Sequence, residues 1–215
     1  MVIKHKSFMH GWHYIYRMHT IKSEQLLNNR FSNVNSYLNS VFDNCPNEYF
    51  LHGPRGSKLK FKVNADLKCS TNHEVIKLAK LGLEVNAERF KSGHSKVQVF
   101  MLENDHKTIA IEVPLWFSPE ESKLYSEILG KDPLTGHIDL LRVEDNKIWV
   151  WDYKPNAISE KFATTQTYFY ALMLSQRAGI PLSNFMCGYF NSAYAFTFDP
   201  NKISMQTKQS VLETR

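Results

Sequence analysis

The stretch GHIDLLRVEDNKIWVWDYKP, residues 136–155, decides the fold. Two apolar runs, residues 136–143 and 147–155, flank the segment Glu-Asp-Asn, which favours a turn. Apolar runs on both sides of a short polar turn are typical of a β-hairpin. The sequence therefore predicts two neighbouring strands at this point in the chain.

Three charged side chains of this hairpin are placed to meet. Side chains alternate between faces along a strand, so Asp152 and Lys154 share one face and Trp151 and Tyr153 point to the other. Asp139 can face the first pair from the neighbouring strand. We therefore expect the two carboxylates and the lysine to reach one common site.

The chemistry of such a site follows from its charges. Two close carboxylates repel each other unless a proton or a cation lies between them. Mg²⁺ prefers one or two carboxylates, and water and substrate phosphate complete its octahedron. The carbonyl of Tyr153 offers a further oxygen, and Lys154 is placed to orient an attacking water or to balance charge in the transition state. This set is suited to phosphodiester hydrolysis.

A simpler hypothesis is that these residues are the solvated positions of an ordinary hairpin. The triplet D-x-K or E-x-K is weak by itself, because it recurs at Asp66, Asp105, Glu121 and Asp145. Only the triplet at Asp152 ends an apolar strand. The preceding predicted strand carries an acidic residue, and a long predicted helix follows. A buried aspartate and lysine need a partner or a metal, which favours the catalytic hypothesis.

Composition sets broader limits. Of the 215 residues, 43% are hydrophobic, enough for a core, and the formal net charge of +5 is compatible with a polyanionic partner. Cys45, Cys69 and Cys187 are unclustered, which argues against a disulfide framework, a zinc ribbon or an iron–sulfur cluster. We expect buried, reduced thiols in a cytoplasmic protein, and no stretch is long and apolar enough for a membrane span.

The order of predicted elements indicates the fold class. Ser159 can cap the clearest helix, residues 159–179, and Gly179 can end it. The other predicted elements are a helix at 71–90, two strands within 96–117 joined by a polar turn, a short helix at 118–130, and final strands within 185–198. This order predicts an α/β sandwich with a mixed β-sheet flanked by helices.

Three short motifs follow one another along the chain in the same order as in a known protein family. G-x-x-D at residues 136–139, D-x-K at 152–154 and Q-x-x-x-Y at 166–170 resemble the PD-(D/E)XK nuclease superfamily, most closely its RecB-type exonuclease branch. The resemblance covers roughly residues 71–198. It implies a restriction-endonuclease-like core, a requirement for Mg²⁺ or Mn²⁺, and cleavage of DNA.

The resemblance also implies roles for individual residues. Asp139 and Asp152 would be metal ligands, and Lys154 would be the catalytic lysine. Gln166 and Tyr170 are four residues apart and share a helix face, which in the family borders the active site and the DNA.

Members of this superfamily often have an additional histidine or glutamate ligand in the metal site, contributed by the first helix of the core. His73, which is followed by Glu74, resembles the RecB-type pattern, although the glycine usually found upstream is missing. Glu84 and Glu88 are rival metal ligands in the same predicted helix, and Glu112, on a predicted strand, is a further candidate. Some relatives carry four cysteines that hold an iron–sulfur cluster. This chain lacks that four-cysteine pattern, so an iron–sulfur cluster is not expected.

Residues 1–70 lie outside the resemblance, so we predict an accessory region at 1–70 and a nuclease core at 71–215. The aromatic and histidine residues at positions 10–16 favour packing or a partner protein over base stacking. The basic segment RGSKLKFK, residues 55–62, is compatible with phosphate contacts or with an edge strand protected by lysines. We expect this region to shape access of the substrate, or to contact another copy or a partner.

The resulting expectation is a metal-dependent DNA exonuclease. An endonuclease that is structure-specific or of restriction type can use the same core. Two further hypotheses remain, namely an inactive DNA-binding subunit with a nuclease fold and a protein-interaction module with a chance motif.

Overall fold

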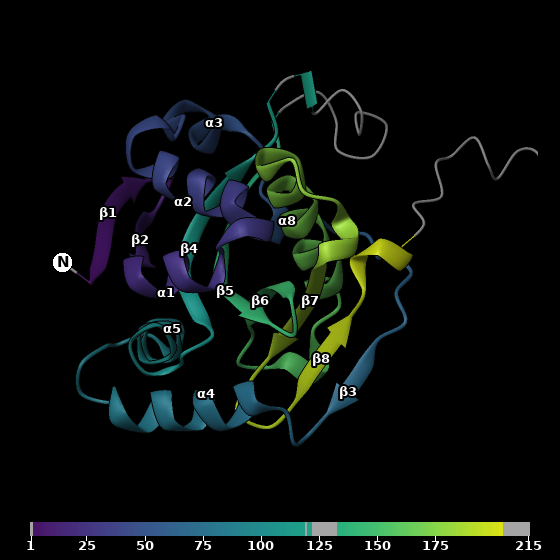
Figure 1. Cartoon of the computed structure of the whole chain (residues 1–215). Coiled ribbons are helices and arrows are strands. Elements are labelled where there is room, and N and C mark those ends of the chain that lie inside the picture. The colour runs from purple at the N-terminus through teal and green to yellow at the C-terminus, as the bar shows by residue number, and fades with distance from the viewer. Residues whose placement is uncertain (1, 119, 122–132, 204–215) are drawn as a thin grey trace, which may run out of the picture.

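In the computed structural model, which describes residues 2–118, 120–121 and 133–203, one mixed β-sheet runs through the molecule (Figure 1). The eight strands of this described part follow the order β1-β2-β4-β5-β6-β7-β8-β3. Neighbouring strands are antiparallel except β6 and β7, which are parallel. The strands are β1 (Ile3–Met9), β2 (His13–His19), β3 (Lys68–Ser70), β4 (Thr108–Trp116), β5 (Thr135–Glu144), β6 (Lys147–Tyr153), β7 (Phe185–Phe190) and β8 (Ala195–Phe198).

The predicted hairpin is confirmed as β5 and β6. Glu144 pairs with Lys147, and the two residues between them, Asp145 and Asn146, both have positive φ angles of 49° and 56°. Two consecutive positive φ values fit the twist of a tight hairpin, and Asp and Asn tolerate them better than most residues. The turn therefore fixes the register that carries Asp152 along β6.

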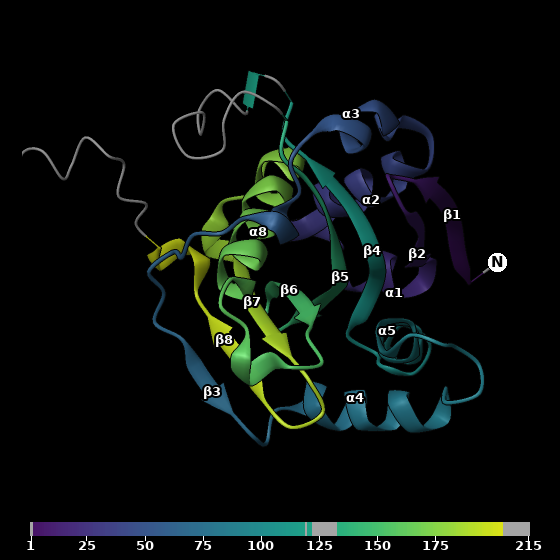
Figure 2. The same ribbon diagram turned by 180° about the vertical axis from the view of Figure 1, so that it is seen from behind.

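Helices cover both faces of the sheet, which confirms the predicted fold class (Figures 1 and 2). Helix α8 (Ala163–Ala178) and α2 (Ser32–Asn44) pack with one face, in the same core cluster as Val150 of β6. Helices α4 (Glu74–Val85) and α5 (Gly93–Asn104) pack on the other, with Trp151 and Tyr153. The shorter helices are α1 (Thr20–Leu26), α3 (Asn47–His52) and 3-10 turns at Asn29–Phe31, Gly56–Lys58, Ala157–Ser159, Leu182–Asn184 and Pro200–Lys202.

The first 70 residues contribute to both edges of this sheet. Strands β1 and β2 form a hairpin, and β2 joins β4 through the pairs Arg17↔Ile111 and Met18↔Ala110. At the opposite edge, β3 pairs with β8. The basic segment 55–62 is not an edge strand, because it comprises a 3-10 turn and irregular chain.

Two predicted elements were wrong in detail. The first predicted strand within 96–117 is part of α5, whose side chains from Val97 to Leu102 are buried between α4 and the sheet. Ser159 does not cap α8, because it lies in a 3-10 turn and the helix begins only at Ala163. The predicted helix at 118–130 lies mostly outside the described residues. Gly179 ends α8 as predicted, with φ of 62°.

The cysteines are free thiols, but only Cys187 is fully buried. Cys45 is half-buried and Cys69 is exposed, so buried packing was a wrong expectation for Cys69. No helix in the described residues has the length and the apolar character needed to cross a bilayer.

Candidate active site

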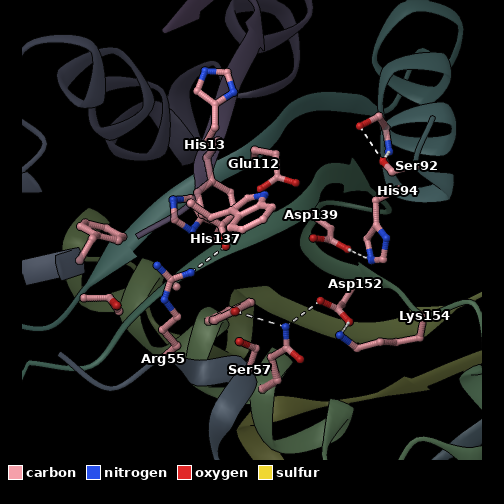
Figure 3. A pocket seen from close by; sticks show the side chains of 18 residues that line it. His13, Arg55, Ser57, Ser92, His94, Glu112, His137, Asp139, Asp152 and Lys154 are labelled. Atoms are coloured by element: carbon pink, nitrogen blue, oxygen red, sulfur yellow. Dashed lines mark hydrogen bonds and ion pairs between the residues drawn. The ribbon is translucent and has the colours of Figure 1, made fainter. Parts of the chain in front are cut away.

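A pocket of about 380 Å³ opens beside the point where the pairing of β5 with β6 ends (Figure 3). Asp139, Asp152, Lys154, Gln166 and Tyr170 all line it. The three sequence motifs, contributed by two strands and a helix, therefore meet at one cavity.

Asp152 is the centre of the polar contacts. Its side chain is 2% exposed, and Lys154 Nζ lies 2.7 Å from Oδ2. From α8, Gln166 Nε2 donates to Oδ1 at 2.8 Å and lies 3.2 Å from the hydroxyl of Tyr170. The Q-x-x-x-Y face thus fixes the orientation of the D-x-K carboxylate.

Asp139 occupies the adjacent strand, where the pairing of β5 with β6 ends at Leu140↔Trp151. Its Oδ2 accepts a hydrogen bond of 2.9 Å from the backbone N–H of Tyr153. A backbone donor beyond the ladder is satisfied in this way by a side chain. Asp139 is therefore held beside Asp152 by the backbone of β6.

Glu112 provides a third carboxylate at the wall of the pocket. The pairs Ile111↔Leu140 and Val113↔Ile138 flank it, so Glu112 is opposite Asp139 in the β4–β5 register. Its backbone has φ of 51°, a left-handed conformation that is costly for this residue type, and Gln98 Nε2 donates to Oε1 at 2.7 Å. The strained backbone and the partner from α5 fix this carboxylate at the pocket.

His94 was missed by the sequence argument. It lies in the first turn of α5, lines the pocket, and places Nε2 at 3.8 Å from Asp139 Oδ2. The pair Gly93-His94 could have indicated it, but the segment was assigned to the end of the preceding helix.

The structure does not bring the predicted ligands of α4 to this pocket. His73 caps α4 by accepting from Val75 N–H at 3.3 Å, and its ring packs against Trp149 and Trp151. Glu84 and Glu88 are exposed. None of these three residues lines the pocket, which α5, through His94 and Ser95, approaches in place of α4.

Burial makes Asp152 and Glu112 weaker acids than free carboxyl groups. Burial, followed by the charge of Asp139, raises the pKa of Asp152 to about 7, although Lys154 opposes the shift. Burial and Asp139 likewise raise the pKa of Glu112 to about 8. Burial lowers the pKa of Lys154, but Asp152 and Asp139 outweigh it, so that the pKa is raised and the ammonium stays charged. Added positive charge would favour the ionised carboxylates.

The carboxylate oxygens of this pocket are the type of ligand that a hard divalent ion prefers. Asp152 Oδ2 is buried and forms an ion pair with Lys154, and among the described residues no donor is aligned for a hydrogen bond to it. Such an oxygen is suited to a cation. In the described part of the chain, no three His, Cys, Asp or Glu side chains are grouped closely enough to hold an ion as they stand, so an ion held by three carboxylates would require side-chain adjustment.

The comparison with protein families agrees with this geometry. A family model of the PD-(D/E)XK nuclease superfamily matches residues 78–213, more than half of the chain, and the match contains all three motifs. A comparison with curated proteins found no match. On the strength of this match and of a mixed sheet that places D-x-K in a polar pocket, the chain belongs to the PD-(D/E)XK nuclease superfamily.

Proposed function

We propose that this protein is a divalent-metal-dependent DNA nuclease of the RecB exonuclease type. The observation that carries the proposal is the convergence of three motifs on one buried carboxylate, Asp152, which Lys154 and Gln166 both contact. A purely structural hairpin has no need to place a half-buried lysine and a buried aspartate beside two further carboxylates.

In this proposal, Asp139 and Asp152 hold Mg²⁺ or Mn²⁺, with Glu112 as the third carboxylate and the Tyr153 carbonyl as a further oxygen. The bound ion would supply positive charge that polarises the phosphate and makes a water a better nucleophile. Lys154 stabilises negative charge on the phosphoryl oxygens as the water forms its bond to phosphorus and the bond to the leaving sugar oxygen breaks. His94, near Asp139, is a further candidate for contact with the ion or the attacking water.

Gln166 and Tyr170 serve two purposes in the proposal. They orient Asp152 through its Oδ1, and they form the wall of the pocket on the side of the DNA. Groups that orient ligands commonly affect metal affinity and activity nearly as strongly as the ligands do. We also propose that residues 1–70 shape access of the substrate to the core at 71–215, and that the protein acts in the reducing cytoplasm.

Cleavage of end-labelled linear DNA and closed circular DNA tests the function directly. We expect wild-type protein to degrade linear DNA with Mg²⁺ or Mn²⁺ but not with EDTA. Lys154→Ala should reduce the rate by about 100-fold or more, because it removes a preorganised charge. Lys80→Ala, which removes an exposed lysine of α4, is the matched control and should cleave normally.

The outcomes separate the hypotheses. Sparing of the circle supports an exonuclease, whereas cutting of the circle indicates an endonuclease. Wild-type protein that binds DNA but cuts nothing with either metal would overturn the proposal in favour of a binding subunit. Absence of both cutting and DNA binding at low salt would favour a protein-interaction module.

A further inference from the structure

The pocket has a second end whose chemistry differs from that of the carboxylates. Residues of the β1–β2 hairpin and of the segment after α3 line it, among them Trp12, Tyr14 and Arg55. Figure 3 shows Arg55 and His137 on one side of the cavity and Asp152 and Lys154 on the other. An aromatic and cationic end beside a candidate phosphodiester site suits a neighbouring part of the same strand.

We propose that Trp12 and Arg55 form a subsite for one unpaired nucleotide of single-stranded DNA, with the base stacked on Trp12 and the phosphate at Arg55. The subsite rests on the proposed nuclease function and adds to it a preference for unpaired strands.

Arg55 is a cation that Tyr14 holds in place. Its Nη1 donates to the hydroxyl of Tyr14 at 2.7 Å, and its guanidinium lies 5.6 Å from the centre of the Tyr14 ring. Its backbone is bridged to Thr135 at the start of β5. Among the described residues no carboxylate forms an ion pair with it. A preorganised guanidinium with free donors is suited to a phosphate.

The histidines beside Arg55 do not share its charge. His137 stacks on Tyr14, with ring centres 3.9 Å apart, and its Nε2 lies 2.9 Å from Nδ1 of His10. Burial is the main cause that lowers the pKa of both histidines, and Arg55 lowers both further. At neutral pH they are therefore uncharged, and of these three residues Arg55 supplies the positive charge at this end of the pocket.

Trp12 is the exposed aromatic group next to this cation. It is 74% exposed, lines the pocket, and follows Gly11, whose φ of +69° forms the turn of the hairpin. A Cβ on Gly11 would lie 2.8 Å from Arg55 Nη2, so the turn and the guanidinium are in direct contact. An indole in this position contributes little to the core, and its open face can stack on any base.

The dimensions and the stacking favour an unpaired strand. A cavity of about 380 Å³ is in the range of roughly 300–1,000 Å³ that is typical of small-molecule sites. It can hold a nucleotide but not a duplex. A base inside a duplex has both faces covered by neighbouring pairs, so it offers no face to Trp12.

Binding measured in EDTA tests the subsite without cleavage. We would titrate fluorescein-labelled single-stranded dT10 and a blunt duplex of the same length, and follow anisotropy at several salt concentrations. Trp12→Ala should weaken single-strand binding by roughly 5- to 100-fold and leave duplex binding unchanged. Arg55→Gln should weaken it as well, and should reduce the slope of log affinity against log salt by about 0.7.

Two variants outside the pocket are the matched controls. Met9→Ala removes an exposed apolar side chain of the same hairpin. Arg30→Gln removes an exposed arginine that does not line the pocket. Both should bind like the wild-type protein. Because Trp12 is exposed, its variant should keep the wild-type melting temperature, which separates lost binding from lost folding.

The subsite is overturned if Trp12→Ala and Arg55→Gln bind single strands like the wild-type protein, or if duplex binding falls equally. A loss of self-association in Trp12→Ala with unchanged DNA binding would instead assign Trp12 to a protein contact and also overturn it. These results are independent of the cleavage assay. Active wild-type protein with unaffected variants contradicts only the subsite, whereas selective binding without cleavage contradicts only the nuclease.

Discussion

Gly136 and Tyr170 contact each other so closely that no side chain fits on the glycine. A Cβ at Gly136 would lie 2.2 Å from Cε1 of Tyr170, and one at Gly56 would lie 2.6 Å from the same atom. The glycine of G-x-x-D therefore leaves room for the tyrosine of Q-x-x-x-Y, whose hydroxyl lies 3.2 Å from Gln166 Nε2. Two motifs that are separate in sequence are thus one packed unit behind Asp152.

Gly136→Ala should therefore damage both the fold and the site. We expect a loss of about 1–3 kcal/mol in the free energy of unfolding, as for other overpacked cores. We also expect reduced cleavage per folded molecule, because the displaced Tyr170 ring disturbs Gln166 and through it Asp152. Urea denaturation and the rate of DNA cleavage measure the two effects.

Gly179→Ala is the matched control for this prediction. Gly179 has φ of +62°, and a Cβ there would meet no neighbouring atom of the described residues within 4 Å, so alanine costs about 1–2 kcal/mol by backbone strain alone. This variant should lose stability but cleave DNA at the normal rate per folded molecule. If Gly136→Ala behaves in the same way, the contact with Tyr170 has no role at the site.

Gln166→Ala should weaken metal binding more than it weakens the fold. The amide orients Asp152 Oδ1 at 2.8 Å, and loss of such a group typically lowers metal affinity or activity by about 10- to 100-fold. Titration with Mn²⁺, followed by calorimetry, measures the effect. Gln25→Ala, an exposed position of α1, should bind Mn²⁺ like the wild-type protein. Equal affinity of both variants would remove Gln166 from the site.

Metal binding should strengthen as the pH rises towards 8. The pKa of Asp152 is raised to about 7 and that of Glu112 to about 8, so an ion that binds at lower pH must displace protons. For each proton displaced, the affinity for Mn²⁺ should rise by up to about tenfold per pH unit below these values. Calorimetric titrations at pH 6, 7, 8 and 9 test this, and a flat profile would contradict it.

The same shifts predict the stability of the metal-free protein. Carboxyl groups with raised pKa values stabilise the fold fully below the values of the unfolded chain, near 4, and this contribution is lost as the pH rises through 7 and 8. In EDTA, the melting temperature should fall from pH 6 to pH 9, and Mn²⁺ should restore most of the loss at the higher pH. Asp152→Asn should fall less steeply, because one of the two titrating groups is gone.

The sequence was sufficient for the hairpin and its motifs, because turn chemistry and strand alternation are local. It was insufficient for α5. Val97 to Leu102 are all buried, and only Gln98 among them is polar, so this part of the helix lacks the apolar-polar periodicity of a surface helix and its apolar run resembles a strand. His73, the first-helix ligand that the sequence predicted, does not line the pocket, whereas the positions of His94 and of the strained Glu112 beside it depend on tertiary contacts.

His94 and His73 make a decisive pair of variants. His94→Ala removes a ring at the pocket, 3.8 Å from Asp139, and should lower cleavage by at least tenfold with little change in stability, since the side chain is 42% exposed. His73→Ala removes the cap of α4 and should cost about 0.5–2 kcal/mol in stability.

His73→Ala should still cleave DNA at the normal rate per folded molecule, because His73 packs against Trp149 and Trp151 outside the pocket. Glu84→Ala, at an exposed position, should change neither property. Cleavage rates and urea denaturation of the three proteins test the assignment together. A loss of cleavage in His73→Ala with an intact His94→Ala would return the first-helix role to α4, and would mean that α4 rather than α5 approaches the substrate.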